Sequence, residues 1–459
     1  MTDTMVQRVA QWVLSFDSAL VDDHAIQLIK NSVLDSLGCA ILTLDEDCVR
    51  GVLEYARSPG GFGQASVIGG GTASLAMATL ANGVLVRAID FNDHLAHNPN
   101  TNAKLGGHPS DNLSAILAIA EWRNLSGSDV IAALLASYEL YGRFYKYLGP
   151  ELPWDHTTSF GLSVPAVAAR LLGLSAEQTA NAIAISVAQS AALGVVRRGV
   201  LSHSKFLASA LIAERGVEAA QLAALGVTGP MTVFEDVRGI SNGIFRSNEE
   251  LDDLVSPIGV HMVEGVTIKA YPGMDTSQAA AEAAVKATTG LKLRASAIAS
   301  IELVMNDHLM TREQTADPLR RAPHSRETAD HSIQYMVAVA LLDGEMTPRQ
   351  FAEGRWFDPE VCDLMNRMVI TIDPAWTKRA PGGFPCTIKL KLKDGAEIRA
   401  EVPYAAGHAR NKMGRAQVVE KFRNCVERRI STARADEIIA AVDGLEGLPS
   451  TRELMRLLV

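Results

Sequence analysis

Apolar residues recur every three or four positions along most of the first 260 residues, the spacing of one face of an α-helix. In residues 5–16, Val9, Trp12, Val13 and Phe16 follow this spacing. The same pattern predicts helices at residues 22–43, 74–89, 111–122, 130–148, 163–172, 175–193 and 205–225. These segments are rich in Ala and Leu and poor in charge, so the pattern predicts a large domain of mutually buried helices.

The pattern changes near residue 256, where strand-like alternation begins. Residues 298–305 alternate like a strand, and residues 385–392 and 397–402 form the clearest predicted hairpin, joined through Lys393-Asp394-Gly395. Apolar side chains of the first hairpin strand would share one face and its lysines the other, as in a sheet with one face in water. Further helices are predicted at residues 277–288, 328–342, 358–368, 415–429 and 435–459. This pattern predicts a smaller α+β domain followed by a helical C-terminal segment.

Composition and charge exclude several classes of protein. The 459 residues exceed what one hydrophobic core usually organises, and 47% apolar with 21% charged residues is typical of an ordered chain. The formal net charge of −9 argues against nucleic acid or an anionic membrane as the main partner. An acidic substrate would therefore need a local cluster of Lys, Arg and His.

The cysteines and the N-terminus predict a reducing, cytoplasmic location. The five cysteines are widely spaced and form no C-x-x-C pair, which argues against a disulfide framework or a structural zinc site. The first residues lack a basic segment before an apolar core, and no run reaches 18 uninterrupted apolar residues.

Ionisable residues concentrate between the helices predicted at 74–89 and 111–122. The 23 positions from residue 90 to 112 hold Lys104, three aspartates and three histidines: Asp90, Asp93, Asp111, His94, His97 and His108. A polar loop held between two core helices can fix titratable groups beside apolar walls, as general acid–base catalysis requires. A capping loop with solvated histidines is the alternative. The histidines do not form an H-x-x-x-H pair on a helix, so no metal site is predicted.

Several segments resemble the MmgE/PrpD family, whose best-known members are 2-methylcitrate dehydratases. They are Asp90-Phe91-Asn92-Asp93, His108-Pro109-Ser110-Asp111-Asn112, Asp155-His156, Lys269 with Tyr271-Pro272, the run 330–339 beginning Asp330-His331, and Gly407-His408-Ala409-Arg410. The segments follow the family's order over most of the chain. The resemblance implies a mainly α fold in which both chain ends, 1–262 and 404–459, form the helical domain. Residues 263–403 would form the inserted α+β domain, and a homodimer is expected.

The resemblance also implies an activity. Members act on small polycarboxylates by proton transfer at a carbon beside a carboxylate, and they include metal-free dehydratases, a cis-aconitate decarboxylase and an iminodisuccinate epimerase. The expected function is a cofactor-independent hydro-lyase of a citrate-like tricarboxylate, by resemblance 2-methylcitrate to 2-methylaconitate. An epimerase, a decarboxylase and a non-catalytic dimeric binding protein of the same fold are the alternatives.

Carried over position by position, the resemblance implies catalytic roles for six residues: Asp90, His108, His156, Lys205, Lys269 and Tyr335. Substrate binding is expected of His94, Ser110, His408 and Arg410. The base would be His108 or His156, lysines would steady an enolate-like charge, and Tyr335 or the other imidazole would supply the acid. Each residue also has a structural alternative: helix capping for the histidines, a surface position for the lysines, and a core position for the tyrosine.

The chain departs from the family pattern in two places. The family usually has Thr where His94 stands, and the 94–108 loop is longer than expected. The decarboxylase branch has a His where Met274 stands, so this position favours the dehydratase branch. Together these expectations predict a positively charged pocket at the seam of two folded units.

Overall fold

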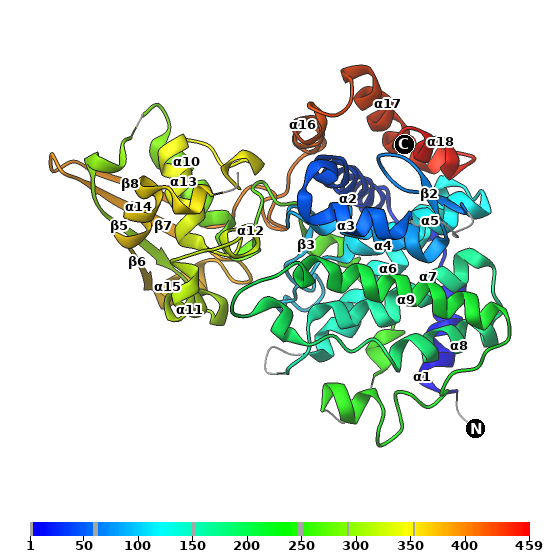
Figure 1. The fold of residues 1–459 in the computed structure, drawn as a ribbon. Coiled ribbons are helices and arrows are strands. Elements are labelled where there is room, and N and C mark those ends of the chain that lie inside the picture. Colours follow the sequence, from blue (N-terminus) through cyan, green and yellow to red (C-terminus); the bar gives the residue numbers. More distant parts are fainter. Residues whose placement is uncertain (1–2, 58–62, 149–151, 247–250, 292, 352–353) are drawn as a thin grey trace.

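The computed structural model describes all residues except 1–2, 58–62, 149–151, 247–250, 292 and 352–353, and it contains two bodies with separate buried cores (Figure 1). The core of the larger body runs from Met5 to Ile268 and resumes from Val418 to Leu458. The core of the smaller body runs from Met274 to Ala405. The chain therefore crosses the seam twice, and the predicted fold class, mainly α with a smaller α+β domain, is confirmed. The domain boundaries after residues 262 and 403 stay a prediction.

The larger body is a packed group of helices, among which α4, α7, α8 and α9 lie against one another. Its helices up to residue 224 are α1 (Met5–Ser15), α2 (Asp23–Leu42), α3 (Asp47–Ala56), α4 (Leu75–Arg87), α5 (Leu113–Arg123), α6 (Gly127–Leu148), α7 (Phe160–Leu172), α8 (Ala176–Val187) and α9 (Ser204–Ala224). The segment Asp23–Asp45, which contains α2, is long and apolar enough to cross a membrane, but it is 78% buried within the protein. That burial is typical of a core helix.

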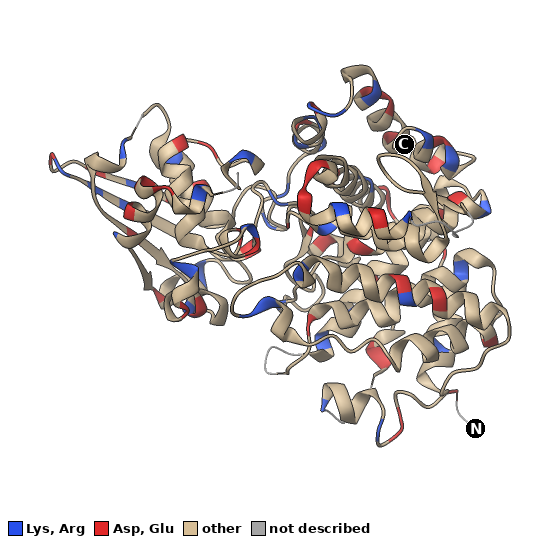
Figure 2. Cartoon of the chain, in the orientation of Figure 1, with Lys and Arg blue, Asp and Glu red and all other residues tan. Residues whose placement is uncertain are grey.

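The last helices of the chain return to the larger body. Helices α16 (Arg415–Val426) and α17 (Thr432–Asp443) pack on α2, and α18 (Thr451–Arg456) packs on α5. Figure 1 accordingly shows the C-terminus in the larger body, with the smaller body inserted between the two parts of the chain. Figure 2 shows acidic and basic residues interspersed over both bodies.

The smaller body is a four-stranded sheet with order β6-β5-β7-β8. Its strands are β5 (Ile298–Met305), β6 (Met368–Ile372), β7 (Cys386–Leu392) and β8 (Glu397–Val402), and only the β5–β6 pair is parallel. Helix α10 (Gln278–Thr288) lies on β7 and β8 and packs against α13 (Ile333–Asp343). Shorter helices are α11 (Leu309–Ala316), α12 (Arg326–Ala329), α14 (Pro359–Asn366) and α15 (Pro374–Arg379).

Most predicted elements are confirmed, and several bounds need correction. The helix predicted at 175–193 ends at residue 187, and the one predicted at 435–459 is divided between α17 and α18. The strand at 298–305 and the hairpin are present, with Lys389 and Lys391 exposed as the alternation predicts. The helix predicted at 358–368 ends at residue 366, because the chain then joins the sheet as β6 beside β5. The helix predicted at 328–342 is interrupted between α12 and α13. The helix predicted at 111–122 begins at residue 113, because a 3-10 turn, Pro109–Asn112, precedes α5.

The loop after α4 is tied to the first crossing. Strand β3 (His94–Leu95) pairs with β4 (Val266–Thr267), and the N–H of Ala96 donates to the carbonyl of Gly265 at 2.9 Å. The loop then folds back on itself, since His97 and Lys104 form a β-bridge and the N–H of Leu105 donates to the carbonyl of Ala96. The long loop is therefore an ordered hairpin at the seam.

Candidate active site

Asp90 stands at the seam between the two bodies. It lies after the end of α4 with a φ of 52°, in the left-handed region that non-glycine residues rarely adopt. Two groups from beyond the first crossing hold its backbone: the N–H of Gly273 donates to its carbonyl oxygen at 3.1 Å, and Lys269 Nζ donates to the same atom at 3.0 Å. The left-handed turn thus presents the Asp90 carboxylate to residues of both bodies.

Three buried cations surround that carboxylate. Lys269 Nζ lies 2.5 Å and Arg87 Nη1 lies 2.9 Å from Oδ1, and Lys205 Nζ lies 3.2 Å from Oδ2. Burial alone would raise the pKa of Asp90, but Arg87, Lys269 and Lys205 outweigh burial and hold this pKa well below its ordinary value. Asp90 is therefore an anion at every pH near neutrality.

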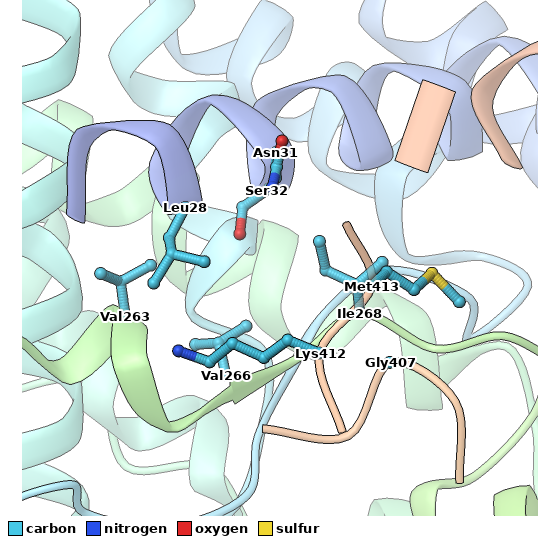
Figure 3. Close-up of a pocket in the computed structure, with 9 residues that line it drawn as sticks. All are labelled: Leu28, Asn31, Ser32, Val263, Val266, Ile268, Gly407, Lys412 and Met413. Atoms are coloured by element: carbon cyan, nitrogen blue, oxygen red, sulfur yellow. The ribbon is translucent and has the colours of Figure 1, made fainter. Parts of the chain in front are cut away.

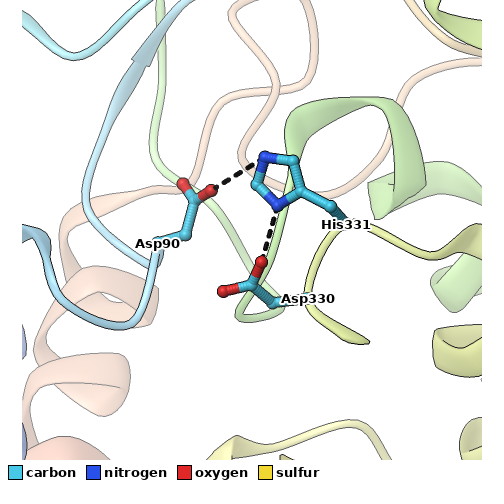
Figure 4. A group of neighbouring side chains, drawn as sticks. All are labelled: Asp90, Asp330 and His331. Carbon is cyan, nitrogen blue, oxygen red and sulfur yellow. Dashed lines mark hydrogen bonds and ion pairs between the residues drawn. The ribbon is translucent and has the colours of Figure 1, made fainter. Parts of the chain in front are cut away.

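Asp330 and His331, at the break between α12 and α13, complete this group, which we call the ion cluster: Arg87, Asp90, Lys205, Lys269, Asp330 and His331. Lys205 Nζ lies 2.7 Å from Asp330 Oδ1, and His331 Nδ1 lies 2.6 Å from the same oxygen. His331 Nε2 also points to Asp90 Oδ2, 3.7 Å away (Figure 4). Burial lowers the pKa of His331 to about 4, so the ring is neutral near pH 7.

The ligand atoms of Asp90, Asp330 and His331 lie within 4.8 Å of one another, a spacing at which three protein groups could hold a metal ion. The Lys205 ammonium, however, already bridges the two carboxylates at 3.2 and 2.7 Å. A divalent cation there would have to displace this ammonium. The donor set therefore fits a protein cation better than a metal.

His108 is held in the tautomer that a general base needs. Its Nδ1 donates to the carbonyl oxygen of Asp93 at 2.5 Å, and because a carbonyl can only accept, the hydrogen belongs on Nδ1. The unprotonated Nε2 then faces Asp90 Oδ1, 3.6 Å away. Burial, together with Arg87 and Lys269, lowers the pKa of His108 well below its usual value. The ring is a neutral base beside an anion that would stabilise its protonated form.

Asp93 is held in turn by two hydroxyl groups. Ser110 Oγ donates to Asp93 Oδ1 at 2.6 Å, and the hydroxyl of Tyr138 donates to Oδ2 at 2.7 Å. Burial raises the pKa of Asp93 to about 7. Ser110 was expected to bind substrate, but its hydroxyl also accepts from Asn92 and is buried, so its contacts are those of a supporting residue.

His156 lies beside His108, with 5.5 Å between the ring centroids. Its Nδ1 is 3.0 Å from the hydroxyl of Tyr141, and burial lowers its pKa to about 3. His156 is not the N-cap of its 3-10 turn, because the side chain of Asp155 caps the turn by accepting from the N–H of Thr157. Asp155 in turn pairs with Arg197 at 2.7 Å. The site thus contains two neutral imidazoles with separate hydrogen-bond partners.

Tyr335 and Arg410 do not join these residues. The hydroxyl of Tyr335 donates to the carbonyl of Gln350, and its ring packs with Phe351 in the core of the smaller body. The expectation of a catalytic phenol is corrected, because that hydroxyl is already used in the core. Arg410 is exposed, and its guanidinium donates to Asn102 at 2.9 Å. The structure does not bring Arg410 to the ion cluster, and its role in substrate binding stays a prediction.

His94 and His408 lie next to the imidazole pair. The rings of His94 and His108 are 5.6 Å apart, and His94 Nδ1 lies 3.5 Å from Asp275 Oδ2. His408 accepts a hydrogen bond from the N–H of Arg410 through Nδ1. Both rings are neutral, because burial lowers each pKa to about 4.

The structure brings the predicted residues Asp90, His108, His156, Lys205 and Lys269 together at the seam. Sequence reasoning missed Arg87, Asp330 and Tyr141 and assigned His331 only a structural role. One signal was available for Arg87: it is the single charged residue of an otherwise apolar helix, and a buried charge needs a partner. The positive character predicted for the site is reduced, since Asp90 and Asp330 balance two of the three cations of the ion cluster.

A separate small pocket lies between α2 and the first crossing (Figure 3). It is lined by Leu28 and Ser32 of α2, by Val266 and Ile268, and by Lys412 of the return crossing. None of the predicted site residues lines it, and the Lys412 ammonium pairs with Glu264. This pocket lacks the acid–base groups of the ion cluster and its neighbouring histidines.

Comparison with known proteins agrees with this arrangement. Residues 7–251 match the MmgE/PrpD N-terminal domain, and residues 271–446 match the MmgE/PrpD C-terminal domain. The 2-methylcitrate dehydratase of Cupriavidus necator is 28% identical over 474 residues, which cover 96% of this chain and 93% of that protein. A 2-methylcitrate dehydratase of Salmonella typhimurium is 26% identical, with 95% and 93% covered. The cis-aconitate decarboxylase of Mus musculus is 27% identical, with 95% and 89% covered. Because the two domain matches span most of the chain in order, this protein belongs to the MmgE/PrpD family.

Proposed function

We propose that this protein is a cofactor-independent lyase that dehydrates a citrate-like tricarboxylate, with 2-methylcitrate as the favoured substrate. The observation that carries the proposal is the His108 tautomer: a neutral Nε2 faces the seam, 3.6 Å from a carboxylate that is always charged. Several relatives that align over most of the chain are named 2-methylcitrate dehydratase, which supports the same reaction.

In the proposed reaction, His108 Nε2 removes a proton from the carbon beside a substrate carboxylate. The electron pair left behind moves towards that carboxylate and gives an enolate-like charge. Asp90 stabilises the imidazolium that forms on His108, as a carboxylate does for the base of a hydrolase triad.

The two lysines steady the developing charge. Lys269 donates to the Asp90 backbone and carboxylate, and Lys205 contacts Asp90 and Asp330. An ammonium carries three donor hydrogens, so each lysine keeps one for a substrate carboxylate. Hydrogen bonds aimed at a developing charge in a buried site stabilise the transition state most.

His156 supplies the acid in this proposal. The ring is neutral in the free protein, so it takes up one proton from solvent together with the substrate, whose carboxylates favour the imidazolium. The electron pair re-forms as a carbon–carbon double bond, and the hydroxyl of the neighbouring carbon leaves with a proton from His156 as water. The contact of His156 with Tyr141 orients the ring for this transfer. The proton that His108 took up and the proton that His156 gave away are exchanged with solvent after product release.

Met274 favours dehydration over decarboxylation. The resemblance places a histidine of the decarboxylase branch at this position, and here the side chain is a buried thioether whose sulfur is in contact with Gln314. The backbone N–H of Met274 donates to Asp330 at 2.9 Å, so the residue lies beside the ion cluster. A thioether cannot transfer protons, which removes one acid–base group from the decarboxylase alternative.

The test is to incubate the purified protein with 2-methylcitrate, citrate, cis-aconitate and iminodisuccinate while following alkene absorbance, CO2 and chirality. Alkene formation from a citrate is expected. Activity only on cis-aconitate or iminodisuccinate would instead establish the decarboxylase or epimerase alternative.

His108→Ala tests the base directly. Loss of a general base is expected to lower kcat by roughly 100- to 10,000-fold, with the fold unchanged by circular dichroism. His324→Ala is the matched control, because His324 is exposed and lies outside the site. If the variant and the control turn over equally, His108 is not the base. A wild-type protein that binds these substrates without turnover would be the binding protein of this fold.

A homodimer in a reducing, cytoplasmic setting is part of the same proposal. All five cysteines are free, and Leu193, Val195 and Val200 expose more than half of their surface on the segment that follows α8. Exposed apolar side chains in one segment are typical of an interface. Light scattering after size exclusion would give twice the chain mass, whereas a monomer mass would contradict the dimer.

A further inference from the structure

The loop that begins at His94 carries a buried lysine, Lys104, that lies outside the ion cluster. Lys104 Nζ is shielded from solvent and has no hydrogen-bond partner among the described residues. Its close contact is the ring of Phe384, with Nζ 3.2 Å from the ring centroid. Leaving a buried donor unsatisfied costs about 1–3 kcal/mol, more for a charged group, so such a residue requires an explanation.

The long loop carries Lys104 to this position. The hairpin from residue 94 to 105 places Lys104 opposite His97 and leaves His94 at the start of the same loop. Phe384 precedes β7, so the Lys104–Phe384 contact joins the larger body to the smaller one. Since the rings of His94 and His108 are 5.6 Å apart, the loop that carries Lys104 begins beside the catalytic imidazole.

The charged and titratable groups that act on this region are few. Asp275 is the acidic group, and it interacts electrostatically with His94, His408, Lys104 and Lys269. His308 also interacts with Lys104, and burial lowers its pKa to about 4. At neutral pH these imidazoles are uncharged. Asp275 is the anion that acts on Lys104, whereas Lys269 is already paired with Asp90. Burial lowers the pKa of Lys104 to about 7, and an added carboxylate would restore its charge.

We propose that Lys104 and His94 form a second carboxylate subsite, which selects tricarboxylates over dicarboxylates. This inference rests on the proposed function, because it names the group that holds the carboxylate farthest from the reacting carbon. His94 Nδ1 also lacks a hydrogen-bond partner among the described residues, at 3.5 Å from Asp275. A carboxylate between the two side chains would accept from both nitrogens.

The proposal also explains the two departures from the family pattern. The longer loop is the segment that carries Lys104, and His94 stands where the family usually has Thr. Both changes add a nitrogen donor at one end of the site. The subsite would therefore distinguish this chain from relatives that have the shorter loop.

Calorimetric titration with citrate and with malate, which lacks one carboxymethyl group, tests the subsite. Lys104→Met keeps the length of the side chain and removes its charge. We expect its citrate affinity to fall on the order of tenfold, as for loss of one charge-assisted hydrogen bond, and its malate affinity to change by less than about twofold. Lys393→Met is the matched control, because Lys393 is exposed in the β7–β8 turn and its loss should alter neither affinity.

Three outcomes separate the subsite from the proposed function. An equal change for both ligands, or no change, would overturn the subsite even if the wild-type enzyme dehydrates tricarboxylates. Selective loss of citrate binding in a protein that turns over no tricarboxylate would uphold the subsite and overturn the proposed function. A wild-type protein that binds neither ligand would overturn both.

A second variant, Lys104→Gln, and the pH dependence of binding distinguish loss of the subsite from misfolding. Lys104→Gln is expected to lose the same preference, and thermal unfolding of both variants shows whether they fold. In the wild type, the preference for citrate should decline as the pH rises through about 7, because Lys104 loses its proton. In Lys104→Met the preference should not change over that range. A wild-type preference that stays constant would contradict the proposal.

Discussion

Arg87, Lys205 and Lys269 each place a nitrogen within 3.2 Å of the Asp90 carboxylate, while the Asp90 backbone is left-handed. That backbone conformation costs about 1–2 kcal/mol for a residue with a Cβ. A buried charge cluster is also weak evidence for stability, since desolvation offsets much of the attraction. Destabilising features that occur together at one residue, such as an unfavourable backbone conformation and buried charges, are typical of functional sites. The Asp90 geometry is therefore better explained by chemistry than by folding.

Tyr335 gives a test at the residue scale. Tyr335→Phe removes the hydroxyl that donates to the Gln350 carbonyl and leaves the ring in the core. We expect turnover to be unchanged and the free energy of unfolding to fall by about 1–3 kcal/mol, the cost of an unsatisfied buried acceptor. Steady-state kinetics and urea unfolding measure the two effects. A decrease in kcat of tenfold or more, which corresponds to roughly 1.4 kcal/mol of activation free energy, would show that the phenol takes part in the reaction.

At the scale of elements, α16 supports the catalytic loop from the far end of the chain. Lys421 Nζ lies 2.5 Å from Asp35 Oδ1 of α2 and donates to the carbonyl of Phe91 at 2.8 Å. Phe91 follows Asp90, so a helix near the C-terminus positions the loop that carries the anion. This contact makes the return of the chain to the larger body part of the site's construction.

Removing Lys421 is expected to destabilise the protein strongly. Lys421→Met leaves Asp35 buried and unpaired, which costs about 3–5 kcal/mol of unfolding free energy. The double variant Asp35→Leu/Lys421→Met removes the unpaired charge as well, so it should be more stable than the single variant. Urea unfolding of both variants measures this difference. A double variant that is less stable than Lys421→Met would show that the pair does not act as one unit.

At the scale of the whole molecule, neutral buried histidines should make stability depend on pH. Burial lowers the pKa of His156 to about 3 and that of five others to about 4, from an ordinary 6.5; the five are His94, His97, His308, His331 and His408. Between these values the unfolded chain binds protons that the folded chain does not. The free energy of unfolding should therefore rise as the pH rises from about 4 to 6.5.

Four carboxyl groups oppose this trend. Burial raises the pKa of Asp93 to about 7 and that of Asp111 to about 6, and it also raises the pKa of Asp35 and of Glu214, so the folded chain binds protons that the unfolded chain has lost. The six imidazoles, with His108 as a seventh, outnumber these carboxyl groups, which gives a net loss of stability in acid. Urea unfolding at several pH values between about 4 and 6.5 measures the slope. A free energy of unfolding that stays level or rises as the pH falls would contradict the predicted burial of these rings.

Local sequence patterns predicted the helices and strands better than they predicted which strands pair and which side chains are in contact. The β7–β8 hairpin depends on contacts between neighbouring segments, so alternation and a turn were enough to predict it. Strand β6 pairs with β5 across more than sixty residues of chain, and its short apolar run was read as the end of a helix. Asp330 was missed for the same reason, because its partner Lys205 is distant in sequence, whereas Arg87 pairs with Asp90 only three residues away.

The amino-acid sequence by itself determined most helices and the hairpin. It also determined the change from helical to strand-like periodicity near residue 256 and the segments that are rich in ionisable residues. All of these depend on periodicity or on residue types within a short stretch. Only the tertiary structure decided that Tyr335 lies in a core, that Arg410 is exposed, and that Lys104 Nζ finds no hydrogen-bond partner in the described part of the chain. The burial, charge balance and protonation of a side chain depend on what lies around it in space, which no local pattern contains.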